Sequence, residues 1–375
     1  ELERAVELAR ENHALTPEQS RYLSRRGTLH RRRGDLDLAW RDFDAAAATV
    51  TVEGSGAGDL EREFWLARSE DERALTLLAR GEFTEAILSF ERNIETFARY
   101  GEHLGVDPSY RVWRGELYLA RAYLCRALGM PYRLPLQPLP RTLPGGPDLE
   151  HARNLAGGVR AQLAGNDQER LYWALRRDSL HLASLLAEDP GEALELAAAA
   201  LQGSSSPYQR AESLAHRAVA CLRAGDGGGA AREAETARAE LADLLGDGER
   251  GDVALRTWLA SLEAQAALVR GEPETAAELL LAGLSEATFA AYHEALLRHF
   301  GEAVEACADP AAARQVLSVR LPGEPRPGGL VAGAGRRGAA DRFGHEGSEA
   351  HGTPGCLSFF PSSGTRGVRV GAEEP

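Results

Sequence analysis

The chain has 375 residues, a formal net charge of −13 at pH 7 and few aromatic side chains, which make up 6% of the sequence. The negative charge opposes general affinity for nucleic acid or for an anionic membrane, because the summed field repels polyanions unless a local basic patch overrides it. All 43 basic residues are arginine, and alanine, leucine and glutamate are abundant. This composition favours helices packed closely through small residues over a sheet core.

Residues 1–13 have the apolar pattern of the second helix of a pair, or of a short cap. The sequence begins at Glu1 without a methionine, which is consistent with a fragment whose N-terminal part is missing. We recognise no signal peptide and no apolar run long enough to span a bilayer, and we therefore expect a cytoplasmic protein.

The first complete helix pair is predicted between Arg21 and Ala48. Gly34 and Asp35 end its first helix, and Ala39 follows Gly34 by five residues, where a side chain larger than a methyl group would hold the two helices apart. The same spacing of glycine and alanine recurs at Gly81 and Ala86, at Gly225 and Ala230, and at Gly271 and Ala276.

The first pair also shows a small residue, an aromatic residue, glycine, alanine, an aromatic residue and alanine in that order. These positions are Gly27, His30, Gly34, Ala39, Phe43 and Ala46. On these residues the chain resembles the tetratricopeptide repeats, fully in the first pair and approximately afterwards, over roughly residues 15–320. The resemblance implies an all-α, right-handed superhelical solenoid of helix hairpins. It also implies that the first helix of each pair lines a concave groove that binds a protein or peptide.

The segment 49–53, TVTVE, is rich in strand-forming residues, and we expect an exposed loop there because a glycine-rich stretch follows it. A stronger break lies at 130–147, where six prolines exclude a helix. We therefore predict four regions: an N-terminal repeat block (1–129), a Pro-rich linker (130–148), a second repeat block (149–320) and a disordered tail (321–375). Helices of the second block are expected at about 149–165, 168–187, 191–202, 207–224, 228–245, 252–270, 274–284, 287–307 and 310–319.

The tail is rich in glycine, proline, serine and arginine and has no sustained period, so it cannot bury enough apolar surface to order itself. A frame-shifted end of the reading frame would have the same composition. Within it, GAGRRG at 333–338 matches the spacing of a dinucleotide-binding fingerprint. No βαβ unit fits into the residues that remain, so we expect no cofactor there.

Arginines gather on the first helix of the first pair. Arg21, Arg25 and Arg32 follow one helix face, and Arg26 and Arg33 continue around it. One interpretation is an anion pocket for a phosphate or an acidic peptide. The other, which we favour, is a solvated face balanced by neighbouring carboxylates such as Glu3, Glu7 and Glu18.

Partner-binding positions follow from the resemblance, carried over pair by pair. They are Arg21, Ser24, Thr28 and Arg31, with Arg32 beside them, in the first pair; Arg68, Asp71 and Leu75 in the second; and Glu116, Leu119, Tyr123 and Arg126 in the third. From these we predict contacts with a partner through Arg21, Ser24, Thr28, Arg31, Arg32, Arg68, Asp71, Tyr123 and Arg126. The clamp of lysine and asparagine that some family members use for carboxylates cannot form, because the chain has no lysine.

Nothing in the sequence predicts catalysis, a metal or a cofactor. The ten histidines are scattered, and His30, His181 and His216 lie in helical patterns where a packed imidazole is the commoner case. His293 and His299 lack the spacing of a zinc helix. The four cysteines are far apart, so we interpret them as buried thiols, and we expect the five tryptophans in the core or in a groove wall.

The sequence therefore predicts a non-enzymatic protein-interaction scaffold whose partner is a peptide or a helix, with no nucleic acid and no membrane as partner. The alternative is the helical sensor or regulatory region of a larger bacterial transcriptional activator or signalling ATPase whose effector domain is missing. Upstream sequence encoding a helix-turn-helix or P-loop domain would favour the alternative.

Overall fold

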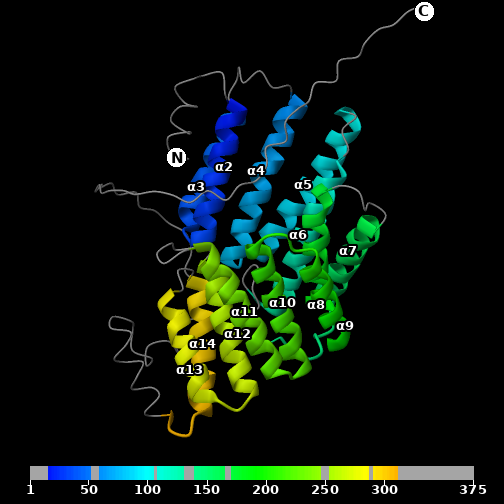
Figure 1. The fold of residues 1–375 in the computed structure, drawn as a ribbon. Coiled ribbons are helices and arrows are strands. Elements are labelled where there is room, and N and C mark those ends of the chain that lie inside the picture. Colours follow the sequence, from blue (N-terminus) through cyan, green and yellow to red (C-terminus); the bar gives the residue numbers. More distant parts are fainter. Residues whose placement is uncertain are drawn as a thin grey trace, which may run out of the picture.

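A computed structural model of the chain describes residues 16–51, 59–104, 108–130, 139–164, 170–245, 253–286 and 290–310. Over these residues the structure is all-α, with thirteen helices and no strand (Figure 1). The helices are α2 (Thr16–Arg33), α3 (Leu36–Thr51), α4 (Asp59–Arg80), α5 (Phe83–Leu104), α6 (Ser109–Leu128), α7 (Pro147–Ala164), α8 (Arg170–Leu186), α9 (Pro190–Gln202), α10 (Pro207–Ala224), α11 (Gly227–Leu245), α12 (Val253–Val269), α13 (Pro273–Glu286) and α14 (Ala290–Ala306).

Each helix packs against the next one in the chain, and the even-numbered helices also pack against one another from α2 to α14. We call these even-numbered helices the inner row. In Figure 1 the chain runs across the upper part of the molecule from α2 to α7 and returns below it from α8 to α14. The return brings α12 into contact with α2. The predicted all-α architecture of successive helix pairs is therefore confirmed.

Glycine ends the first helix of four pairs in the same way. Gly34, Gly81, Gly225 and Gly271 have φ values of 90°, 78°, 80° and 78°, in the left-handed region that favours glycine. At the first turn the Gly34 N–H donates to the carbonyl of Arg31 at 3.1 Å, and the next N–H donates to the carbonyl five residues before it at 2.9 Å. The same pair of bonds recurs at the other three glycines. The predicted turns are confirmed, and the backbone conformation explains their residue type.

The alanine after each of these turns is enclosed between packed helices. Ala39, Ala86, Ala230 and Ala276 are each 0% exposed. Close packing extends to the helix before the turn in the first pair, because a Cβ atom added to Gly27 would lie 2.7 Å from the ring of Phe43. Methyl-sized side chains or none at all are therefore required at these contacts, as the spacing predicts.

The segment TVTVE differs from the prediction, because α3 continues through Thr49 to Thr51. Val50 is buried, and the Thr49 hydroxyl donates to the carbonyl of Ala46 at 2.7 Å. Valine disfavours a helix only slightly, and burial of the face that it shares with Ala46 outweighs that preference. Val52 and Glu53 lie outside the described residues.

The packing continues across the predicted Pro-rich division. Helix α7 packs against α6, and a single cluster of buried apolar side chains extends from α6 through Leu143 and α7 to α12. Arg223 of α10, which is 1% exposed, donates to the carbonyls of Ser184, Leu185 and Ala187 and to that of Arg141 in the segment before α7. Residues 131–138, the tail from 321 to 375 and residues 1–13 lie outside the described part of the chain.

The cysteines that the structure describes are all buried, whereas the tryptophans differ in burial. Cys125, Cys221 and Cys307 are buried free thiols, as predicted, and Cys356 lies outside the described residues. Trp258 is fully buried, whereas Trp173 is 52% exposed on α8.

None of the helices that the structure describes combines the length and the apolar character that crossing a membrane requires.

Candidate functional site

Helices α2, α4 and α6 of the inner row share one carboxylate. Glu72 of α4 accepts a hydrogen bond from Arg31 Nη2 at 2.8 Å and one from Arg114 Nη2 at 3.0 Å. The Thr28 hydroxyl lies 3.4 Å from the same carboxylate. Three consecutive helices of the inner row are thus bridged through a single side chain.

Helical spacing explains why these side chains meet. Thr28 and Arg31 are three residues apart on α2, and Arg111 and Arg114 are three residues apart on α6, so each pair lies on one face of its helix. On α4, Arg68 and Glu72 are four residues apart and follow the same rule. We call the side chains of Arg31, Arg68, Asp71, Glu72, Arg111 and Arg114 the arginine cluster.

The arginine cluster has more positive than negative charge. Burial, together with the charges of Arg111 and Arg114, lowers the pKa of Arg68 to about 10. Burial alone would raise the pKa of Glu72, but Arg31 and Arg114 outweigh it and hold that pKa below its ordinary value. Four guanidinium groups therefore face two carboxylates, and the excess charge favours an additional anion.

Asp71 is the second carboxylate and is buried more deeply than the first. It accepts a hydrogen bond from Asn93 Nδ2 at 3.0 Å. Burial raises its pKa to about 6, although Arg114 and the bond from Asn93 act in the opposite direction. Asp71 therefore compensates the arginines only when the pH exceeds about 6.

A cleft adjoins the arginine cluster between α6, α8 and α10. Its lining residues are Arg114, Leu117, Tyr118, Arg121, Leu175, Asp178, Leu182 and Glu212. The α6 side is basic, the α8 and α10 side is acidic, and leucines separate the two. Basic and acidic side chains therefore meet in one small cleft.

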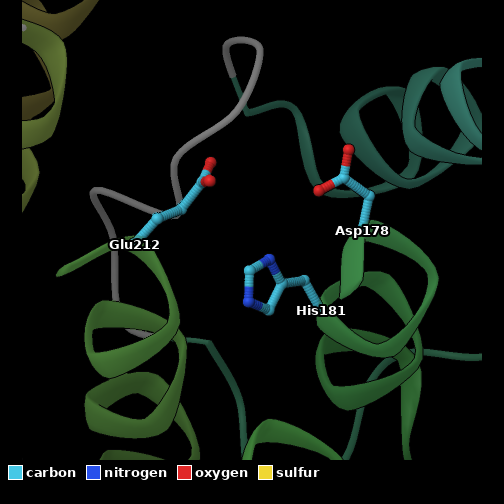
Figure 2. A group of neighbouring side chains, drawn as sticks. All are labelled: Asp178, His181 and Glu212. Atoms are coloured by element: carbon cyan, nitrogen blue, oxygen red, sulfur yellow. The ribbon is translucent and has the colours of Figure 1, made fainter. Parts of the chain in front are cut away.

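The acidic side of the cleft brings together three groups that can bind a metal ion. Figure 2 shows Asp178 and His181 projecting from α8, and Glu212 from α10, around one space. Their ligand atoms all lie within 4.8 Å of one another. Arg177 Nη2 donates to Asp178 Oδ1 at 2.8 Å and lies 3.6 Å from Glu212 Oε2. Burial lowers the pKa of His181 to about 4, against the smaller opposite effects of Glu212 and Asp178, so the ring is neutral at pH 7.

Aromatic rings connect the inner-row helices α8, α10 and α12. The rings of His181 and His216 stack with centroids 4.1 Å apart, and His216 meets Trp258 edge to face at 5.0 Å. All three side chains are buried. We call them the ring ladder. The histidines predicted to be packed imidazoles at these positions are confirmed as buried.

Most of the predicted partner-binding residues of α2 and α4 lie at the arginine cluster. Arg31, Arg68 and Asp71 belong to it, and Thr28 lies beside Glu72. Arg21 is exposed and its charge acts on Arg68, whereas Ser24 accepts a hydrogen bond from the Thr28 hydroxyl through its carbonyl. The side chain of Arg32 lies outside the described part of the structure.

The predicted partner-binding positions on α6 lie away from the arginine cluster. The Tyr123 hydroxyl donates to Glu91 of α5 at 3.0 Å and its ring stacks on His151 of α7, while Arg126 binds Asp148 of α7 at 2.7 Å. Tyr123 is nine residues after Arg114, which corresponds to about two and a half helical turns, so the two side chains point in opposite directions. The repeat register thus places these two predicted positions on a different face of α6 from Arg114. Leu75 and Leu119, also carried over from the repeats, are buried in a core cluster.

Two other arginines of α2 are either paired within the first helix pair or exposed. Arg26 forms a bidentate pair with Asp42 of α3, through bonds of 2.8 and 2.6 Å, and Arg25 is exposed. The carboxylate comes from the second helix of the same pair. Glu3, Glu7 and the side chain of Glu18, which were the expected partners, lie outside the described residues.

Sequence reasoning missed several residues of the site. A signal existed on α6, where Arg111, Arg114 and Arg121 recur at spacings of three and seven residues. Asp178 and His181 are three residues apart on one helix, which is a weaker signal. Glu212 lies on a different helix, and no local pattern connects it to them.

A comparison with protein-family models finds no family that matches this chain, and a comparison with curated proteins finds no match either.

Proposed function

We propose that the helix pairs form a right-handed solenoid of the tetratricopeptide type, and that its concave side binds an acidic segment of a partner protein. In this proposal the protein acts in the cytoplasm and catalyses no reaction. The observation that carries this proposal is the charge of the arginine cluster, in which four guanidinium groups face two carboxylates in a chain of net charge −13. A local excess of arginine in an acidic protein favours the binding of an anion, which a partner would supply.

The chemistry of the inner row defines the partner further. Guanidinium groups bind carboxylates through two parallel hydrogen bonds, so glutamate and aspartate side chains are suitable ligands. Leu117, Leu175 and Leu182 add an apolar floor in the adjoining cleft. The partner that fits both features is a peptide or helix in which acidic residues alternate with apolar ones.

Two arginines of this surface can be changed at little cost to the packing of the helices, because the one interhelical contact at stake among the described residues is that of Arg111 with the ring of Phe64. Arg21 is exposed, and Arg111 lies over the rings of Phe64 and Tyr110 at 6.0 and 5.7 Å. Arg41 is exposed on α3, outside the inner row, and serves as the matched control. The double variant Arg21→Glu/Arg111→Gln therefore alters the charge of the surface, whereas Arg41→Glu alters only the charge of the protein.

The test measures the fluorescence anisotropy of a labelled peptide in which glutamate and leucine alternate. A peptide in which lysine and leucine alternate serves as the control of opposite charge. The wild-type protein is expected to bind the acidic peptide, and more weakly as salt rises. The double variant should lose at least about tenfold in affinity, which corresponds to about 1.4 kcal/mol, and Arg41→Glu should lose less than about twofold. Equal binding by both variants, or preference for the basic peptide, would contradict the proposal. Affinity capture with the wild type and the double variant then identifies the natural partner.

A further inference from the structure

The three groups on the acidic side of the cleft have the chemistry of a metal site. Asp178 and His181 lie on one face of α8, and Glu212 reaches the same space from α10. In Figure 2 one ring nitrogen of His181 is turned toward the space between the two carboxylates. A mixed set of one imidazole and two carboxylates suits divalent transition metals better than Mg²⁺ or Ca²⁺, which prefer oxygen ligands alone.

Counting the hydrogen bonds around His181 identifies which of its two ring nitrogens carries the proton. The Ser204 hydroxyl lies 3.0 Å from the carbonyl of Ala200, and because a carbonyl cannot donate, Ser204 uses its only proton there. Ser213 lies 2.8 Å from Ser204 and must therefore donate to it. Ser213 then has no proton left for His181 Nε2, which is 2.8 Å away, so Nε2 is the donor. His181 consequently presents an unprotonated Nδ1.

This Nδ1 is an unpartnered acceptor on a side chain that is 1% exposed, because the structure gives His181 a single hydrogen bond, through Nε2. It lies beside two carboxylates, so the three groups together offer lone pairs and no proton. Metal-binding histidines typically donate their other ring N–H to a fixed acceptor, which orients the ring. The relay from His181 through Ser213 and Ser204 to the backbone of α9 has this form.

We propose that Asp178, His181 Nδ1 and Glu212 bind one divalent transition-metal ion of the Zn²⁺ class. Three protein ligands leave at least one coordination position for water or for a donor atom in the cleft, as in exchangeable sites. Ligand atoms around such an ion are roughly 3–4 Å apart, so the three groups, whose ligand atoms lie within 4.8 Å of one another, need to close by at most about 1 Å, and Asp178 is the side chain best able to move. Its side chain is 41% exposed and can make this movement.

Arg177 competes with the metal for the same carboxylates. It donates to Asp178 and supplies a positive charge beside Glu212. Removing this charge is expected to strengthen metal binding. Arg177→Gln therefore distinguishes a metal site from an ion pair that is complete in itself, because only a metal site gains affinity from the change.

The experiment uses the full chain without an affinity tag, treated with a chelator and titrated calorimetrically with ZnCl₂, MnCl₂ and MgCl₂. The expected result is one Zn²⁺ site that is absent in His181→Gln. Asp178→Asn should weaken it at least tenfold, and Ser213→Ala by about 10- to 100-fold, because the ring loses its fixed acceptor. Arg177→Gln should bind several-fold more tightly. Glu235 is exposed on α11, away from the site, so Glu235→Gln makes the same change of a carboxylate to an amide as Asp178→Asn and should leave binding unchanged.

Two further readouts keep the test decisive. Co²⁺ absorbs visible light with an intensity that depends on its coordination, so its spectrum in wild type and in Asp178→Asn reports directly on the ligand set. If His181→Gln does not fold, as judged by circular dichroism, then Asp178→Asn and Arg177→Gln decide the question. Equal Zn²⁺ affinity of wild type, Asp178→Asn and Glu235→Gln would overturn the proposal, as would Mg²⁺ binding as tight as Zn²⁺ binding. None of the three proposed metal ligands belongs to the arginine cluster, so the variants that test peptide binding and those that test metal binding are different, and either proposal can fail alone.

Discussion

The inner row has two halves, and successive helices are held together by different kinds of side-chain contact in each half. On α2, α4 and α6, successive helices are joined by guanidinium and carboxylate groups centred on Glu72. On α8, α10 and α12, they are joined by the buried rings of His181, His216 and Trp258. Helix α10 is buried on nearly all sides, whereas the side chains of Arg31 and Arg114 keep part of their surface in water.

The difference shows how charge limits burial along a row of equivalent helices. An ionised group that loses its water costs several kcal/mol unless hydrogen bonds replace that water, so a charged row must remain partly open. Neutral rings carry no such cost and can be enclosed completely. The second half buries one guanidinium, Arg223, and satisfies it with four backbone carbonyls. The open half is therefore the one suited to a charged partner.

The largest expected effect comes from breaking the ring ladder. Trp258→Ala should lower the free energy of unfolding by about 3–5 kcal/mol, because it leaves a large cavity among helices that cannot collapse into it. Trp173→Ala removes the same side chain from an exposed position on α8 and should cost less than about 1 kcal/mol. Urea denaturation followed by circular dichroism measures both, and similar costs for the two variants would contradict the contrast.

The charged half should respond to pH through Asp71. Its pKa is about 6 in the folded protein against 3.8 ordinarily, so folding favours the protonated form. The stabilisation is complete below about pH 4 and is lost as the pH rises through 6, by up to about 3 kcal/mol. Asp71→Asn keeps an acceptor for Asn93 and removes the titration. Arg111, Arg114 and Glu72 remain around it.

The measurement is the difference in unfolding free energy between Asp71→Asn and wild type at a series of pH values. This difference should shift in favour of the variant between about pH 4 and pH 8. A difference that stays constant over this range would show that Asp71 titrates normally.

Removing the shared carboxylate should destabilise the charged half by a smaller amount. Glu72→Gln leaves Arg31 and Arg114 without their common partner, and because both remain partly hydrated, we expect a loss of about 2 kcal/mol. Glu63 on the same helix pairs with Arg99, and both side chains are about half exposed. Glu63→Gln should cost less than about 0.5 kcal/mol. Thermal unfolding at two salt concentrations separates the two cases, since salt screens the exposed pair.

Two glycine substitutions, one of them with the smallest expected effect, test packing between helices. Gly27→Ala places a Cβ atom 2.7 Å from the Phe43 ring and should destabilise the first pair by about 1–3 kcal/mol. Gly157 lies on α7 with no atom within 4 Å of an added Cβ atom. Gly157→Ala should therefore stabilise the protein by about 0.5–1 kcal/mol, as expected for alanine in an open helical position. The opposite signs of the two changes are the expected result, and a stabilising Gly27→Ala would contradict the close contact.

Local rules allowed the helices and their turns to be predicted from the sequence. A glycine at a helix end adopts a left-handed conformation, and an alanine after the turn fits between two close helices, because backbone sterics and side-chain volume act within a few residues. The arginines of α2 and α4 were found for the same reason, since residues three or four apart share a helix face.

Contacts between helices determined which side chains share a surface or a site. Which face of α6 meets α4 depends on how α5 and α7 pack around it, and this packing placed Tyr123 and Arg126 away from Arg114, in contact with α5 and α7. Asp178, His181 and Glu212 meet because α10 packs on α8, and no spacing within the chain encodes that meeting. The sequence by itself determined helices, turns and an excess of arginine, whereas the tertiary structure determined which charges share a surface, because the energy of burying a charge depends on neighbours that are distant in sequence.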